Sequence, residues 1–157
     1  RDGILRVTLA PHRNPALQKA AEVLLKRVLR HFDYAGVLTI EFFVERGRLV
    51  ANEMAPRVHN SGHWTIEGAA TSQFENHLRA ILGWPLGDTR ALGHAAMVNL
   101  IGTMPDRDAL LALPGVHLHA YGKTPRTGRK LGHCTLVATT ARDRDRLLRR
   151  VQRRLRP

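Results

Sequence analysis

The chain has 157 residues, a 43% apolar fraction and a formal net charge of +12. The length suits one ordinary domain or two small ones, and the apolar fraction is sufficient for a hydrophobic core. No run of about 18 apolar residues is present, which excludes a membrane-spanning helix and argues against a membrane partner. Cys134 is the single cysteine, so no internal disulfide is expected and a reducing cytoplasm is favoured. The positive charge favours anionic partners such as nucleotides, phosphates or nucleic acid.

The first residues contain neither an initiator methionine nor the apolar stretch of a signal peptide. A short strand pattern begins almost at once, over Gly3–Ala10. We therefore expect the chain to be a piece of a longer protein.

A helix is predicted next. Asn14 is a good N-cap, and Pro15 suits the first helical position. Apolar residues then recur at helical spacing up to Phe32 and form one stripe. Gly36 ends this connection.

A β-hairpin follows, with two acidic residues of interest. Val37–Val44 is rich in β-branched and aromatic residues, and Leu49–Glu53 is the expected returning strand. With a three-residue loop over 46–48, Glu41 lies directly opposite Glu53 on one face of the sheet. Like charges there are destabilising unless a positive group lies between them. Mg²⁺ is a suitable hard ion, and ion pairs with arginines such as Arg46 or Arg48 are the alternative. With a loop of two or four residues, Glu41 would face Asn52 instead.

The stretch from Asn52 to Thr65 concentrates polar side chains at the carboxyl end of the second strand. Pro56 and Gly62 prevent regular structure, so a loop held by a rigid scaffold is predicted, which suits a binding site. The guanidinium of Arg57 can form a two-pronged contact with a phosphate. His59, Asn60 and Ser61 offer directional hydrogen bonds. His59 and His63 are four residues apart, but zinc is disfavoured because the segment is not predicted to be helical.

The rest of the chain predicts a mixed arrangement of helices and strands. Ser72 and Glu75 form a capping-box pattern for a helix whose buried face would hold Phe74, Leu78, Ile81 and Leu82, with His77 facing outward. The breakers between Pro85 and Gly93 predict a domain boundary. Beyond it the expected elements are strands over 95–101, 116–121 and 131–139, and helices over 105–113 and 143–155. The predicted class is α+β, not a doubly wound sheet.

A basic loop lies between the last two strands. Lys123, Arg126, Arg129 and Lys130 flank a proline and a glycine, and such a loop can surround a phosphate. Cys134 follows His133 directly. Because neighbouring residues of a strand point to opposite faces, we expect a core thiol rather than a Cys–His nucleophile.

The paired Glu41 and Glu53, the polar loop and the late Gly128-Arg129-Lys130-Leu131-Gly132-His133 resemble the ATP-grasp enzymes. Within them the pattern is similar to the 5-(carboxyamino)imidazole ribonucleotide synthases of purine biosynthesis. Two further stretches match in the family's order: Gly3-Ile4-Leu5-Arg6 and Ser72-Gln73-Phe74-Glu75-Asn76-His77-Leu78-Arg79-Ala80.

The resemblance implies the second half of an ATP-grasp domain over residues 1–88 and a small mixed C-terminal domain over residues 89–157. It implies an ATP-dependent ligase that carboxylates aminoimidazole ribonucleotide with bicarbonate, acting as a cytoplasmic homodimer when complete. Glu41 and Glu53 would hold Mg²⁺, Asn52 and Glu53 would contact ATP, and Arg57 would be catalytic. The expected ribonucleotide-binding residues are His59, Asn60, Ser61, Lys123, Arg129 and Lys130. The first half of the grasp is not present, so the piece alone is expected to be inactive.

The alternative is a basic nucleic-acid-binding module without catalysis. The net charge and the arginine-rich run from Arg142 to Arg156 favour it. Against it, aromatic residues are only 5% of the chain, and no helix-turn-helix pattern is present.

Overall fold

The computed structural model describes residues 3–155. In chain order its elements are β1 (Val7–Ala10), α1 (Pro15–His31), β2 (Thr39–Glu45), β3 (Arg48–Ala55), the 3-10 turn η1 (Asn60–Gly62), α2 (Thr65–Gly68), α3 (Gln73–Ile81), β4 (His94–Ile101), α4 (Arg107–Leu111), β5 (Val116–Ala120), β6 (Lys130–Ala138) and α5 (Ala141–Arg154). Arg156, the end of the arginine-rich run, lies outside the described residues. Within residues 3–155, no helix has the length and apolar character that crossing a membrane requires.

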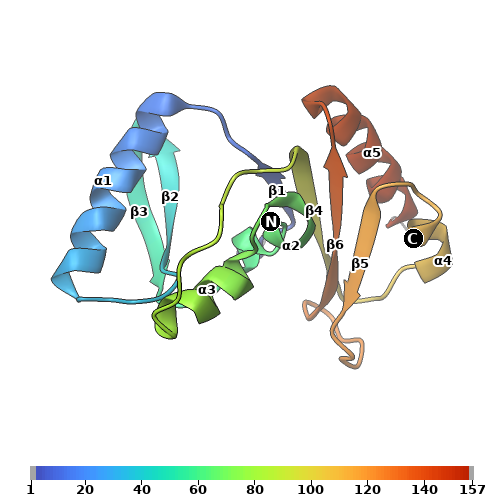
Figure 1. Cartoon of the computed structure of the whole chain (residues 1–157). Coiled ribbons are helices and arrows are strands. Elements are labelled where there is room, and N and C mark those ends of the chain that lie inside the picture. The colour runs from blue at the N-terminus through green and yellow to red at the C-terminus, as the bar shows by residue number, and fades with distance from the viewer. Residues whose placement is uncertain (1–2, 156–157) are drawn as a thin grey trace.

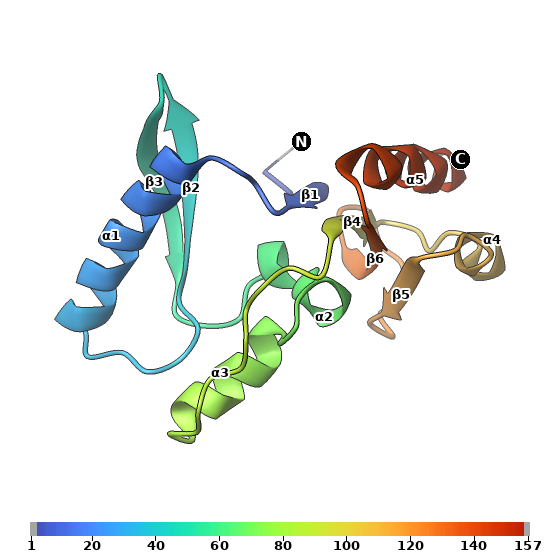
Figure 2. The same ribbon diagram turned by 45° about the horizontal axis from the view of Figure 1, so that its top comes forward.

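The strands form a four-stranded sheet and a separate hairpin. The sheet has the order β1-β4-β6-β5, and all its neighbours are antiparallel. Helices α4 and α5 lie on one side of this sheet (Figures 1 and 2), and α2 contacts β6. This mixed arrangement confirms the predicted α+β class.

The main core lies between the sheet and the helices α4 and α5. Strand residues Val98 and Leu136 pack there with Leu110 of α4 and Val151 of α5. Cys134 belongs to the same cluster and is fully buried, which raises the pKa of its thiol to about 11. A thiol with this pKa is protonated at neutral pH, so the prediction of an inert core cysteine is confirmed.

The hairpin of β2 and β3 packs beside α1 on the opposite side of the molecule (Figure 1). As predicted, Asn14 caps α1: its Oδ1 accepts the Leu17 N–H at 3.2 Å. β1 precedes this helix but pairs with β4, placing Val7 opposite Val98. β1 therefore lies before the predicted domain boundary in the sequence but belongs to the four-stranded sheet, whose other strands lie after it.

The predicted buried face of α3 is wrong for three of its four residues; the fourth, Phe74, is half-buried and lies near His63. Leu78, Ile81 and Leu82 are each more than half exposed, whereas Asn76 is buried. The polar face is turned inward because it holds loop backbone: Asn76 and Gly87 exchange two hydrogen bonds, and His77 Nδ1 accepts the Val37 N–H at 3.0 Å.

The capping box at the start of α3 forms in part. Ser72 Oγ accepts the Glu75 N–H at 3.2 Å, as the sequence predicts. The Glu75 carboxylate pairs with Arg79 one turn along the helix, instead of reaching back to the cap. The cap therefore fixes the start of α3 through the serine.

Candidate metal and nucleotide site

Glu41 and Glu53 lie directly opposite each other in the hairpin. The expected position is confirmed, but the expected cause is wrong. Glu45 pairs with Arg48, so the loop holds only Arg46 and Gly47. Both have positive φ angles, 48° and 76°, as the tightest hairpin turns require.

A β-bulge restores the alignment that this two-residue turn would otherwise lose. The register shifts between Glu41 and Phe42: Phe42 faces Ala51 and Glu41 faces Glu53. Asn52 is the extra residue in β3, and its Nδ2 donates to Glu41 Oε2 at 3.3 Å. Bulges re-aim side chains beside functional sites, and this one brings a second carboxylate and an amide to Glu41.

The imidazole of His59 lies against both carboxylates. Its Nε2 is 3.1 Å from Glu53 Oε1, and its Nδ1 is 3.6 Å from Glu41 Oε1. Ser61 approaches Nδ1 through its Oγ at 2.8 Å and its backbone N–H at 3.3 Å. Because Nδ1 accepts that N–H, the neutral tautomer that fits carries its proton on Nε2 and donates it to Glu53.

Oxygen and nitrogen atoms of Glu41, Glu53 and His59 lie within 4.8 Å of one another. The two acidic side chains stay accessible, with exposed fractions of 32% and 55%, whereas that of His59 is 9% exposed. Two accessible carboxylates beside an amide are a donor set that suits a hard divalent cation.

The backbone of His59 is held by Gln73 at the start of α3. Gln73 Oε1 accepts the His59 N–H at 3.0 Å, and Gln73 Nε2 donates to the His59 carbonyl at 2.8 Å. The same Nε2 lies 2.9 Å from His63 Nδ1. Sequence reasoning placed Gln73 only in the helix start, since a glutamine gives no signal of the partner it will meet.

Asn60 is held by a partner from the other side of the predicted domain boundary. Its amide exchanges two hydrogen bonds with Asn99 of β4, at 3.0 and 2.7 Å, and Asn99 also donates to the Leu5 carbonyl. Lys130 Nζ donates to Asn60 Oδ1 at 3.2 Å. One of the three basic-loop residues assigned to the ribonucleotide therefore reaches the polar loop. Asn99 was missed because a single polar residue in an apolar strand pattern suggests only a tolerated exception.

The other predicted site residues have different contacts. Arg57 is exposed and donates to the Val58 carbonyl at 2.9 Å. Lys123 Nζ lies 5.3 Å from the ring centre of Tyr121, and Arg129 donates to the Thr124 carbonyl at 3.3 Å. These three cations are exposed, and within residues 3–155 these contacts of Lys123 and Arg129 stay inside the basic loop and its neighbour Tyr121.

A group of histidines links the polar loop to the four-stranded sheet: His63 comes from the loop, and His119 and His133 come from β5 and β6. His133 is 2% exposed, stacks on His119 with ring centres 4.5 Å apart, and shares a 2.7 Å hydrogen bond with the Tyr121 hydroxyl. Burial, helped by His119 and His63, lowers the pKa of His133 to about 4. His119 pairs with Glu67 of α2 at 2.6 Å. These contacts join α2 to β5 and β6 beneath the site.

His63 lies at the edge of this group. Its ring centre is 5.4 Å from that of His133 and 5.1 Å from that of Phe74. Burial is the main cause that lowers the pKa of His63, so its imidazole is neutral at pH 7. A neutral His63 can accept the Gln73 amide hydrogen at Nδ1.

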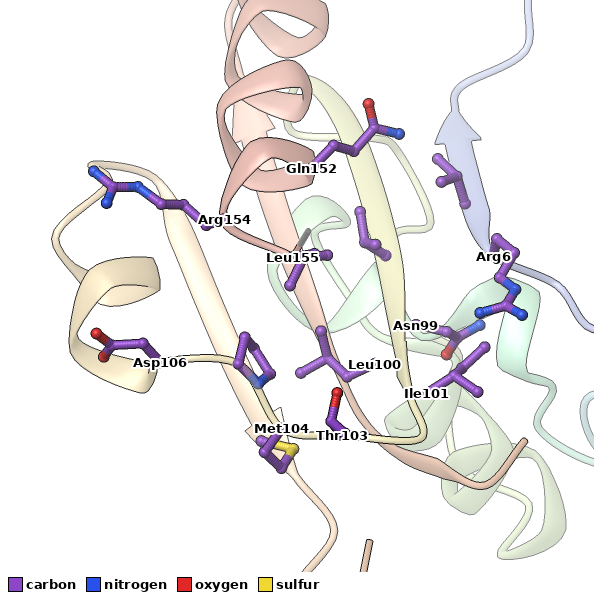
Figure 3. Close-up of a pocket in the computed structure, with 13 residues that line it drawn as sticks. Arg6, Asn99, Leu100, Ile101, Thr103, Met104, Asp106, Gln152, Arg154 and Leu155 are labelled. Carbon is purple, nitrogen blue, oxygen red and sulfur yellow. The ribbon is translucent and has the colours of Figure 1, made fainter. Parts of the chain in front are cut away.

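A cavity of about 690 Å³ lies elsewhere, between β4, the residues before β1 and the end of α5. Figure 3 shows Arg6 and Asn99 at one end and Arg154 and Asp106 at the other. Neither Glu41, Glu53 nor His59 lines it. The carboxylates of Glu41 and Glu53 and the imidazole of His59 are the groups that could bind a metal ion. We therefore place the candidate site at this accessible cluster and not in the cavity.

The fold and the site define a protein of the ATP-grasp class. Residues 1–74 match the model of the ATP-grasp domain, and residues 95–146 match that of the phosphoribosylaminoimidazole carboxylase C-terminal domain. The chain belongs to the N5-carboxyaminoimidazole ribonucleotide synthase family.

The relatives named N5-carboxyaminoimidazole ribonucleotide synthase are longer. The one from Pseudomonas aeruginosa is 56% identical over 134 residues, which are 85% of this chain and 37% of the relative. The one from Escherichia coli is 49% identical over 138 residues, 87% of this chain and 39% of the relative. The chain thus spans less than half the length of these proteins.

Solved structures agree with these relatives. The N5-carboxyaminoimidazole ribonucleotide synthetase of Thermus thermophilus superposes with a TM-score of 0.94 at 55% identity, covering 97% of this chain and 43% of that one. The Aspergillus clavatus synthase in complex with ADP and 5-aminoimidazole ribonucleotide has a TM-score of 0.88 at 34% identity, covering 99% of this chain and 45% of that one.

Proposed function

We propose that this chain carries the metal-binding and ribonucleotide-binding part of an ATP-dependent ligase. The reaction joins bicarbonate to aminoimidazole ribonucleotide and gives 5-(carboxyamino)imidazole ribonucleotide, ADP and phosphate, a step of purine biosynthesis. The observation that carries the proposal is the aligned pair Glu41 and Glu53 beside His59, within a fold shared with a synthase solved with ADP and the ribonucleotide.

The metal role is assigned to Glu41 and Glu53. Their oxygens, with the Asn52 amide, fit Mg²⁺, a cation that takes carboxylates and substrate phosphates together. When bound, Mg²⁺ would neutralise negative charge on the ATP phosphates. Asn52 and Glu53 would form the nucleotide contacts. Like carboxylates face each other here, so the free hairpin is predisposed to take up a cation.

Arg57 is assigned to the transferring phosphoryl group. Attack of a bicarbonate oxygen on the γ-phosphorus breaks the bond to ADP and gives carboxyphosphate. The exocyclic amine of the ribonucleotide then captures the carboxyl carbon or the CO₂ released from it, phosphate leaves, and the amine loses a proton. The exposed guanidinium of Arg57 can turn from the Val58 carbonyl and form a two-pronged contact with phosphoryl oxygens.

The ribonucleotide is assigned to the polar loop and the basic loop. His59, Asn60 and Ser61 supply oriented hydrogen-bonding groups, and Lys130 already contacts Asn60. Lys123 and Arg129 are exposed and would turn toward the ribonucleotide phosphate. The proposal also includes a cytoplasmic location and a homodimer for the longer protein.

The test is release of ADP that depends on both bicarbonate and aminoimidazole ribonucleotide, measured with the longer protein that contains this chain. Glu53→Gln should lower turnover by about 100-fold or more, because losing several kcal/mol of charge stabilisation corresponds to at least that factor. Glu45→Gln is the matched control, since Glu45 is exposed in β2 near the turn.

The control should keep the parent's turnover. Full turnover by the Glu53→Gln enzyme would show that the metal role is misplaced. ADP release that does not depend on the ribonucleotide would instead show that the substrate is misassigned.

A further inference from the structure

Gln73 contacts the candidate site from outside it through its side-chain amide. Its side chain is half-buried at the first position of α3 and is not among the residues assigned to metal or substrate. Its amide meets both the N–H and the carbonyl of His59, at 3.0 and 2.8 Å. A side-chain amide that pairs with both groups of one residue fixes the orientation of that peptide segment.

The second amide hydrogen of Gln73 reaches a second imidazole. Nε2 lies 2.9 Å from His63 Nδ1, while its other hydrogen bond goes to the His59 carbonyl. An amide nitrogen is only a donor, so His63 Nδ1 must accept and the proton of His63 sits on Nε2. One glutamine therefore sets the backbone of His59 and the tautomer of His63.

The surroundings are shaped for this contact. Gly62 lies where a Cβ atom would be 2.6 Å from Gln73 Oε1, so a side chain at position 62 would displace the amide. The Gln73 N–H is anchored on Thr65 Oγ1 at 3.0 Å, and Thr65 Oγ1 donates to the Gly62 carbonyl. The loop and the helix start thus form one hydrogen-bonded unit.

We propose that Gln73 is a positioning residue for the candidate site. It holds the His59 imidazole against Glu53 and Ser61, and it keeps His63 in its Nε2–H tautomer. This inference rests on the proposed function for its catalytic consequence, but its geometric part does not. A loop that lacks this clamp would sample other backbone conformations, and misplacement by about 1 Å can cost about 100-fold in rate.

The first experiment reads geometry without activity. Nitrogen-15 NMR of the 157-residue chain reports the His63 tautomer, and amide exchange reports protection of the His59 N–H. Gln73→Glu keeps the shape but cannot donate to either acceptor, and Gly62→Ala leaves the glutamine but displaces it. We expect both variants to lose the Nε2–H signature of His63, and Gly62→Ala also to lose protection of the His59 amide.

The controls separate positioning from stability. Ser72→Ala removes the α3 cap and should cost about 1 kcal/mol in stability while leaving the His63 tautomer unchanged. Gln18→Glu changes an exposed glutamine on α1 whose hydrogen-bond partner is Glu22, and should change neither readout. An unaltered His63 tautomer in Gln73→Glu, or the same tautomer change in Ser72→Ala, would overturn the proposal.

The second experiment uses the longer protein and measures kinetics. Gln73→Glu should lower kcat/KM for the ribonucleotide by about 100-fold, because the clamp orients His59 of the polar loop. If the parent makes product and Gln73→Glu matches Ser72→Ala in kinetics, the inference fails while the function stands. If the parent makes none, the function fails and the NMR measurement still decides the geometry.

Discussion

His133 shows how one side chain depends on its burial. It is surrounded by His119 of β5, the hydroxyl of Tyr121 and the ring of His63, and its Nε2 is buried without a partner in the described part of the chain. A charge on His133 would have no carboxylate partner of its own, since the Glu67 carboxylate contacts His119. The neutral form is therefore strongly preferred in the folded chain.

This preference predicts acid sensitivity. The pKa of His133 is about 4 in the folded chain and 6.5 in the unfolded chain. Between these pH values the unfolded chain therefore binds a proton that the folded chain does not bind. Stability should be full above pH 6.5 and fall by about 1.4 kcal/mol per unit toward pH 4, a total of about 3 kcal/mol. Denaturant unfolding across this range measures it.

The comparison for His133 is made between variants. His133→Gln should flatten the part of the pH dependence that this histidine causes. His117→Gln is the control, because His117 is on the neighbouring strand but exposed. Parallel pH profiles for the parent and His133→Gln would contradict the prediction.

At the scale of elements, the turn and the bulge together set the position of the carboxylates. The two-residue turn alone would put Asn52 across from Glu41, and the bulge at Asn52 moves Glu53 into that place. Gly47 adopts φ +76° with open space around it, so an added side chain would be penalised by backbone strain alone.

We expect Gly47→Ala to destabilise the chain by about 1 kcal/mol, because a left-handed conformation costs about that much for alanine. Gly47→Asn should recover most of the loss, since asparagine tolerates positive φ. The measurement is the free energy of unfolding in denaturant. Equal stability of the alanine and asparagine variants would show that the turn is not strained.

At the scale of the whole molecule, the candidate site joins residues of the hairpin and of the four-stranded sheet. The hairpin supplies Glu41 and Glu53, and the sheet supplies Asn99 and Lys130, which both contact Asn60. The acidic groups remain accessible, and the chain spans less than half of its relatives. In the proposed reaction, carboxyphosphate would be lost to water in an open site, so the proposal requires enclosure of the reactants.

The 157-residue chain by itself should therefore bind Mg-ATP weakly and make no carboxyaminoimidazole ribonucleotide. Calorimetry with Mg-ATP and the ADP-release assay test this, with the longer protein as the positive control. Full activity of the chain alone would show that these residues are sufficient for catalysis.

The sequence by itself determined the local structure and the family. Helix caps at Asn14 and Ser72, the strand patterns and the core position of Cys134 follow from short-range rules, because neighbours in the chain decide them. Residue patterns singled out the polar loop and both carboxylates, and the resemblance implied their roles. Whether each proposed site residue acts as assigned stays a prediction.

The tertiary structure decided what distant contacts control. The bulge at Asn52, the inward polar face of α3, and the clamps by Gln73 and Asn99 all depend on partners that lie in other elements. Hydrophobic spacing marks Leu78 and Ile81 as buried, but only the packed chain shows that Asn76 and His77 bind the adjoining loops. Such hydrogen bonds leave no periodic pattern in the sequence, because their positions depend on which backbone N–H and C=O groups lack a partner in the folded chain.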